Sequence, residues 1–174
     1  MRRGAPAVLA AVAVLAAAGC SKGADPKPPE LPTALCGVSV DPEVLKPLLV
    51  PGEEVAVSLA GAASGGAGCA VSVDGKRILA LENTTGPATL DYRSTWKWQM
   101  ANGTAVEIGD AGRATDTLVS AARACAVGSR KAVFVSRAER FSTAGGDAAA
   151  RKEALTRFMA AYFPAAQKAA GCTA

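Results

Sequence analysis

Five cysteines carry most of the chemistry that this sequence offers. Cys20 lies near the start, and Cys36, Cys69, Cys125 and Cys172 are spread over the rest of the 174 residues. A cysteine thiol can be oxidised to a disulfide, bind a metal ion or react as a nucleophile, and spacing and surroundings decide among these roles. The sequence contains no histidine. Ser-His-Asp triads, Cys-His dyads and imidazole metal sites are therefore excluded.

The first residues predict export. Residues 1–3 (MRR) are cationic, an apolar run covers residues 5–18, and Gly19-Cys20 follows. A membrane-spanning helix needs about 20 apolar residues, so this shorter run indicates a signal peptide over residues 1–19. The end of the run, residues 17–20 (AAGC), resembles the lipobox of bacterial lipoproteins. That resemblance implies that the Cys20 thiol receives a diacylglyceryl group and that Cys20 becomes the first residue of the mature chain.

The alternative is secretion without a lipid, with residues 16–18 (AAA) as the cleavage site. The cysteine count favours lipidation of Cys20, because the other four cysteines then form an even set that can close as two disulfides. Two acyl chains would hold the protein on the outer face of the cell membrane without a transmembrane helix. Residues 20–35 then form the lipidated cysteine and a Pro-rich tether with four prolines, which favours extended polyproline II structure.

Residues 36–174 predict a single α+β domain, an antiparallel sheet packed against a C-terminal helix. A short helix starts at residues 41–43 (DPE), where a capping acid precedes a proline. Alternating or continuous apolar residues predict strands at 55–59, 69–73, 76–80, 92–100, 105–108, 117–127 and 132–135. Helical spacing of large apolar residues predicts the terminal helix over 147–168, with Pro164 as a kink or an end.

Asp74-Gly75 gives the clearest turn signal, because this pair favours a two-residue type I′ hairpin. The predicted register places Val73 opposite Lys76 and Val71 opposite Ile78. Cys69 shares the face of Val71 and is therefore expected to point inward.

The four cysteines of the domain allow three pairings. We favour Cys36 with Cys69, which would join the N-terminal helix to the hairpin. The second pair, Cys125 with Cys172, would join the C-terminal helix to a strand that it covers. A zinc site or a redox pair is disfavoured because no C-x-x-C motif occurs. We expect no metal and no cofactor.

Residues 92–100 hold the best candidate for a ligand site. Tyr92, Trp96 and Trp98 share one face of the predicted strand, with Arg93 and Lys97 nearby. Aromatic rings with a few polar groups suit sugars and apolar ligands. The same alternation is typical of a strand face that points into the core. Both interpretations stay open at this stage.

The layout of the mature chain is similar to that of small actinobacterial lipoproteins built around a domain of unknown function. The likeness rests on residues 34–36 (ALC) before a short Pro-initiated helix, residues 69–71 (CAV) opening a strand, a cysteine-bearing strand, and an Ala-rich helix ending in residues 171–172 (GC). The resemblance implies a fold like the PsbP-like α/β sandwich. It supplies no catalytic residue.

These observations predict a non-enzymatic binding or docking module of the cell envelope, with the membrane and an envelope protein as its partners. The alternative is a lipoprotein that binds a small ligand or wall polymer through the aromatic strand face. Catalysis is not expected, because the carboxylates are scattered without an acid/base arrangement. Nucleic acid is not expected either: without Arg2 and Arg3 the chain has 17 basic against 15 acidic residues, with no basic stripe.

Overall fold

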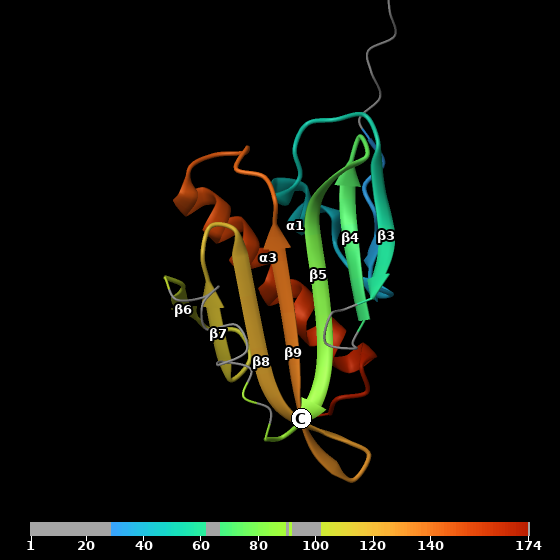
Figure 1. Cartoon of the computed structure of the whole chain (residues 1–174), viewed down its shortest axis with the longest axis vertical. Helices are drawn as coiled ribbons and strands as arrows, with labels where there is room; N and C mark the ends of the chain where they lie inside the picture. The colour runs from blue at the N-terminus through green and yellow to red at the C-terminus, as the bar shows by residue number, and fades with distance from the viewer. Residues whose placement is uncertain (1–28, 62–66, 90, 92–101, 174) are drawn as a thin grey trace, which may run out of the picture.

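The protein folds as a seven-stranded antiparallel sheet with a long C-terminal helix, α3, across one face (Figure 1). The computed structural model describes residues 29–61, 67–89, 91 and 102–173. The order of the strands in the sheet is β3-β4-β5-β9-β8-β7-β6. This architecture confirms the predicted α+β class.

The elements have the following bounds. The sheet is built from β3 (Val55–Gly61), β4 (Ala67–Val73), β5 (Lys76–Pro87), β6 (Thr104–Val106), β7 (Ala111–Ala114), β8 (Leu118–Val127) and β9 (Arg130–Arg140). A separate small hairpin consists of β1 (Ala34–Leu35) and β2 (Val38–Ser39). The helices are α1 (Pro42–Leu45), the 3-10 turn η1 (Lys46–Leu48) and α3 (Ala148–Ala169).

The short N-terminal helix begins as predicted. The Asp41 side chain accepts a hydrogen bond from the Glu43 backbone N–H at 2.9 Å, and Pro42 occupies the first helical turn. The helix continues directly into η1. Leu45 and Leu48 are fully buried, so this segment contributes to the main core.

The Asp74-Gly75 turn forms with φ values of 49° and 74°, as a type I′ turn requires. Val73 lies opposite Lys76, as predicted, but Val71 lies opposite Leu79, so the predicted pairing with Ile78 was wrong. The register shifts between Val71 and Ser72. This bulge allows two successive apolar residues of β5 to be buried, whereas strict alternation would expose one of them.

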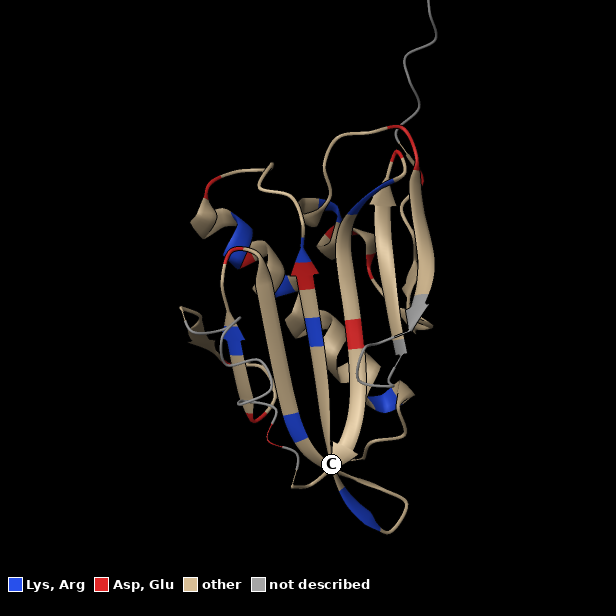
Figure 2. Cartoon of the chain, viewed as in Figure 1, with Lys and Arg blue, Asp and Glu red and all other residues tan. Residues whose placement is uncertain are grey.

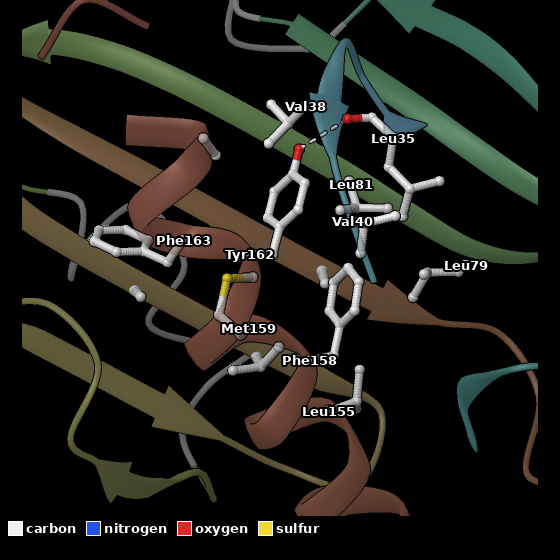
Figure 3. Packing of buried hydrophobic residues seen from close by; sticks show 14 of the residues in the cluster. Leu35, Val38, Val40, Leu79, Leu81, Leu155, Phe158, Met159, Tyr162 and Phe163 are labelled. Atoms are coloured by element: carbon white, nitrogen blue, oxygen red, sulfur yellow. Dashed lines mark hydrogen bonds between the residues drawn. The ribbon is translucent and has the colours of Figure 1, made fainter. Parts of the chain in front are cut away.

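Helix α3 provides the cover for one face of the sheet. Asp147 caps its start by accepting a hydrogen bond from the Ala150 N–H at 2.8 Å. Its buried residues follow the predicted spacing and meet the hairpin β1–β2 and strand β5 (Figure 3). They are Leu155, Phe158, Met159, Tyr162, Phe163, Ala166 and Gln167. Pro164 lies inside the helix and does not end it.

Both predicted disulfides are present. Cys36 and Cys69 have Cα atoms 5.2 Å apart, and the Cα atoms of Cys125 and Cys172 are 5.5 Å apart. The first bridge joins the turn between β1 and β2 to β4, and the second joins the chain after α3 to β8. Cys69 is buried, which confirms its predicted inward direction. The two layers of the domain are therefore covalently linked at two places.

Among the helices in the described ranges, none combines the length and the apolar character needed to cross a lipid bilayer.

Candidate docking edge of the sheet

Several residues singled out in the sequence lie outside the described residues. They are Cys20, Tyr92, Arg93, Trp96, Lys97 and Trp98. The candidate surface among the described residues is the β3 edge, which the sequence did not single out.

Strand β3 forms one edge of the sheet, at the opposite side from β6 (Figure 1). Within the described part of the chain it pairs with β4 alone, through all of its seven residues. Its other side therefore presents the alternate backbone N–H and C=O groups that a neighbouring strand would bond. The β6 edge has only three residues, and a very short edge strand is a poor template for pairing.

Exposure of the apolar residues increases along β3. Val55 packs against the main core, Val57 is 38% exposed and Leu59 is 84% exposed. Val57 and Leu59 lie opposite Val71 and Cys69 of β4, which are buried. Directly opposite residues share a face of the sheet. The layer that covers this face therefore buries the β4 residues but not Val57 and Leu59 of β3. An apolar stripe is left exposed at the edge.

One other large apolar side chain is exposed on the described surface. Phe141 is 44% exposed, and the guanidinium of Arg77 lies 4.4 Å from the centre of its ring. This cation–π contact covers part of the ring. Val57 and Leu59 thus form the exposed apolar pair that stands closest to an open sheet edge.

Charge is confined to one end of this edge. Residues 55–61 (VAVSLAG) carry no charged side chain and no proline, whereas Glu53 and Glu54 come directly before them. The Asp74 carboxylate accepts hydrogen bonds from the backbone N–H groups of Glu53 and Glu54 at 3.0 and 2.9 Å. The start of β3 is therefore fixed to the hairpin turn, and it is acidic.

Several other charged groups form ion pairs within the domain. Arg137 on β9 lies between two carboxylates, 3.3 Å from Glu82 and 2.5 Å from Glu139. Figure 2 shows the basic residues on separate elements rather than in one stripe. The guanidinium of Arg137 thus forms ion pairs with both carboxylates, and the pair with Glu82 links β9 to β5.

Two further arginines organise the segment before α3. Arg140 is 2% exposed and donates from Nε to the Leu48 carbonyl at 2.9 Å, and its terminal nitrogens donate to the Ser142 and Ala144 carbonyls. Burial, and then repulsion from Arg151, lower the pKa of Arg140. Arg151 pairs with Asp116 at 2.6 Å. These contacts position the loop and leave Arg140 enclosed by carbonyls.

A buried polar chain crosses the core. Ser136 Oγ donates to Asn83 Oδ1 at 2.8 Å, and Asn83 Nδ2 donates to the Tyr162 hydroxyl at 2.8 Å. That hydroxyl donates to the Leu35 carbonyl at 3.4 Å, the contact drawn as a dashed line in Figure 3. Burial raises the pKa of Tyr162, and the hydrogen bond from Asn83 partly opposes the shift. The phenol is thus protonated at neutral pH and joins α3, β5 and β1.

No group of three or more metal-binding side chains comes together among the residues that the structure describes. No family model, no curated protein and no solved structure matches this chain. The functional assignment therefore depends on the cysteine pairing and on the geometry of the β3 edge.

Proposed function

We propose that this protein is a cell-envelope lipoprotein, a non-enzymatic docking module held on the outer face of the membrane by an acylated Cys20. One observation carries the location: the two disulfides use all four cysteines of the domain. Such bridges form and persist in oxidising compartments outside the cytoplasm. Of the five cysteines in the chain, Cys20 is left without a cysteine to pair with, as a lipid acceptor would be.

The leader sequence supports the same proposal. Residues 1–19 have the cationic start and apolar run of a signal peptide, and the lipobox resemblance ends at Cys20. The Pro-rich segment that follows would act as a tether between the lipid and the domain. Membership among the actinobacterial lipoproteins of unknown function is part of this proposal, and so is a fold like the PsbP-like sandwich.

Docking is favoured over catalysis because of how the side chains are used. The groups with a shifted pKa in the described residues are Arg140 and Tyr162, and both are engaged in hydrogen bonds that hold elements together. Strand β3, in contrast, pairs with β4 alone among the described strands and carries the exposed Leu59. Proteins recognise such edges by adding a strand to the sheet. We therefore place the docking function at β3.

The anchor is tested by metabolic labelling with palmitate in the native host. Wild-type protein is expected to carry the label in the membrane fraction, and Cys20→Ala is expected to lose the label. Ser21→Ala is the matched control, because it changes the next residue and keeps the thiol. Equal labelling of wild type and Cys20→Ala, or no label on the wild type, would overturn the lipoprotein proposal.

A further inference from the structure

We propose that the partner which pairs with the β3 edge is a second copy of this chain. The two β3 strands would run antiparallel about a two-fold axis at Ser58, so that two seven-stranded sheets become one continuous sheet. The inference rests on the proposed docking function and identifies the partner. It follows from three features of β3: its self-complementary spacing, its charge distribution and its lack of protection against pairing.

The spacing of the exposed apolar residues matches a two-fold axis at Ser58. Val57 and Leu59 lie one residue on either side of Ser58, so this axis places Val57 of each copy opposite Leu59 of the other. Both side chains point to the α3 face, and they would cover one another across the interface. Directly opposite apolar residues are the pairs that stabilise a sheet.

The same register uses the whole strand. An axis at Ser58 pairs position 55 with position 61 of the other copy, so all seven residues of β3 take part. Moving the axis by one residue, to Val57 or Leu59, leaves part of the strand unpaired or brings Glu53 into the paired region. A register centred on Ser58 therefore gives the most backbone hydrogen bonds without a charged residue inside the pairing.

Charge favours the antiparallel orientation. Glu53, Glu54 and Asp74 gather at the start of β3, and an antiparallel pair places these two acidic ends at opposite ends of the interface. A parallel pair would place them side by side, where like charges destabilise a sheet. The acidic end of each copy thus selects the orientation that the apolar spacing also selects.

Strand β3 itself, which lies wholly within the described residues, has no lysine, proline, bulge or shortness to prevent edge pairing. Natural edge strands are protected by lysines, prolines, bulges or short length. Strand β3 has seven residues, no charge, no proline and an unbroken register with β4. The opposite edge, β6, is protected by its length of three residues. The two edges differ as expected if only β3 is used for association.

Cross-linking through the axis tests the register. A Ser58→Cys variant of the full chain places two thiols directly opposite each other, within the Cα separation of 4.4–6.8 Å that a disulfide needs. We expect a covalent dimer on non-reducing gels after mild oxidation. Val57→Cys is the matched control: its two thiols lie on the diagonal, about 7–8 Å apart by Cα, and should give little dimer. Ser129→Cys, at the exposed tip of the β8–β9 hairpin, controls for random collision.

A charge swap tests the same contact without cysteine. Val57→Glu or Leu59→Lys alone should weaken the dimer about tenfold, because the two-fold axis repeats each loss. The double variant Val57→Glu/Leu59→Lys places opposite charges across the axis and should restore most of the affinity. Sedimentation of the full chain in detergent measures the dissociation constant. Circular dichroism should be unchanged, because both side chains are already exposed.

The outcomes separate this inference from the anchor proposal. Two results would overturn self-association: a monomer at all concentrations, or Ser58→Cys dimers no more abundant than Val57→Cys dimers. Self-association would also be overturned if β3 were found to pair with a strand of another protein instead. Failure of palmitate labelling with a Ser58→Cys dimer still formed would overturn the anchor and leave the dimer supported. The gel can be run on envelope or culture supernatant, so either location permits the test.

Discussion

Tyr162 joins three elements, because it lies on α3 and its hydroxyl contacts β5 and β1. Its ring stacks on Phe158 with centroids 5.4 Å apart, and its hydroxyl accepts from Asn83 and points to the Leu35 carbonyl. A buried polar group that loses its partner costs about 1–3 kcal/mol. The hydroxyl therefore stabilises the packing of α3 on β5 and on the β1–β2 hairpin.

We predict that Tyr162→Phe lowers the free energy of unfolding at pH 7 by about 1–3 kcal/mol, because Asn83 Nδ2 loses its acceptor. The folded pKa of Tyr162 is raised above its ordinary value of 10.0. The protonated phenol contributes its full stabilisation below pH 10, the pKa of the unfolded state. This contribution to the free energy of unfolding is lost as the pH rises through the folded pKa. Urea unfolding at pH 7 and near pH 11 should show a smaller difference between wild type and variant at the higher pH.

Ser136→Ala provides the control for this pH series, since it removes a hydrogen bond of the same buried chain and no ionisable group. Its free energy of unfolding should differ from that of the wild type by the same amount at both pH values. If the free energies of unfolding of wild type and Tyr162→Phe differ by the same amount at both pH values, burial does not raise the pKa of Tyr162.

At residue scale the sequence predicted directions better than partners. The inward direction of Cys69 and the buried face of α3 followed from periodicity alone. The partner of Val71 did not, because the bulge in β5 depends on how Ile78 and Leu79 pack rather than on the turn residues. The hydrogen bonds of Arg140 were also beyond the sequence, because they join residues far apart in the chain.

At the scale of elements, the two disulfides fix the β1–β2 hairpin and the segment after α3 to the sheet. They close loops with sequence separations of 33 and 47 residues. The chain-entropy model gives about 4 kcal/mol for each loop, and measured losses for native bridges are about 2–5 kcal/mol. Because the two loops are similar in length, the two bridges should stabilise the domain to a similar extent.

We predict that Cys36→Ala/Cys69→Ala and Cys125→Ala/Cys172→Ala each lower the free energy of unfolding by about 2–5 kcal/mol. Double variants are used so that no single thiol is left to form wrong bridges. Urea unfolding followed by circular dichroism measures both. A loss below about 1 kcal/mol for either pair would contradict a stapling role for that bridge.

Elements with clear local signals were predicted, and those held by distant contacts were not. The Asp-Gly turn, the capped short helix and α3 all carry local signals. The β1–β2 hairpin was missed because its turn is Cys36-Gly37 and each of its strands has two residues. Strand β9 was predicted only as far as Val135, because Arg137 and Arg140 appear polar until their partners Glu82 and Leu48 are known.

At the scale of the whole molecule, the order of the strands decides which of them lie at the edges of the sheet. Sequence showed that residues 55–59 form a strand, but no local pattern shows that this strand lies at an edge. That position follows from β5 pairing with β9 and from β3 pairing with β4 alone among the described strands. The absence of charge in residues 55–61 was visible in the sequence, and it gained a functional meaning only from the topology.

We propose that Cys20 carries the lipid while the other four cysteines close the domain. Both parts of this proposal can be measured by intact and peptide mass spectrometry of protein isolated from its native envelope without reduction. We expect a mature chain that begins at Cys20 with a diacylglyceryl group, and cross-linked peptides joining Cys36 to Cys69 and Cys125 to Cys172. An unmodified chain that begins before residue 20, or a free thiol at any of those four positions, would contradict it.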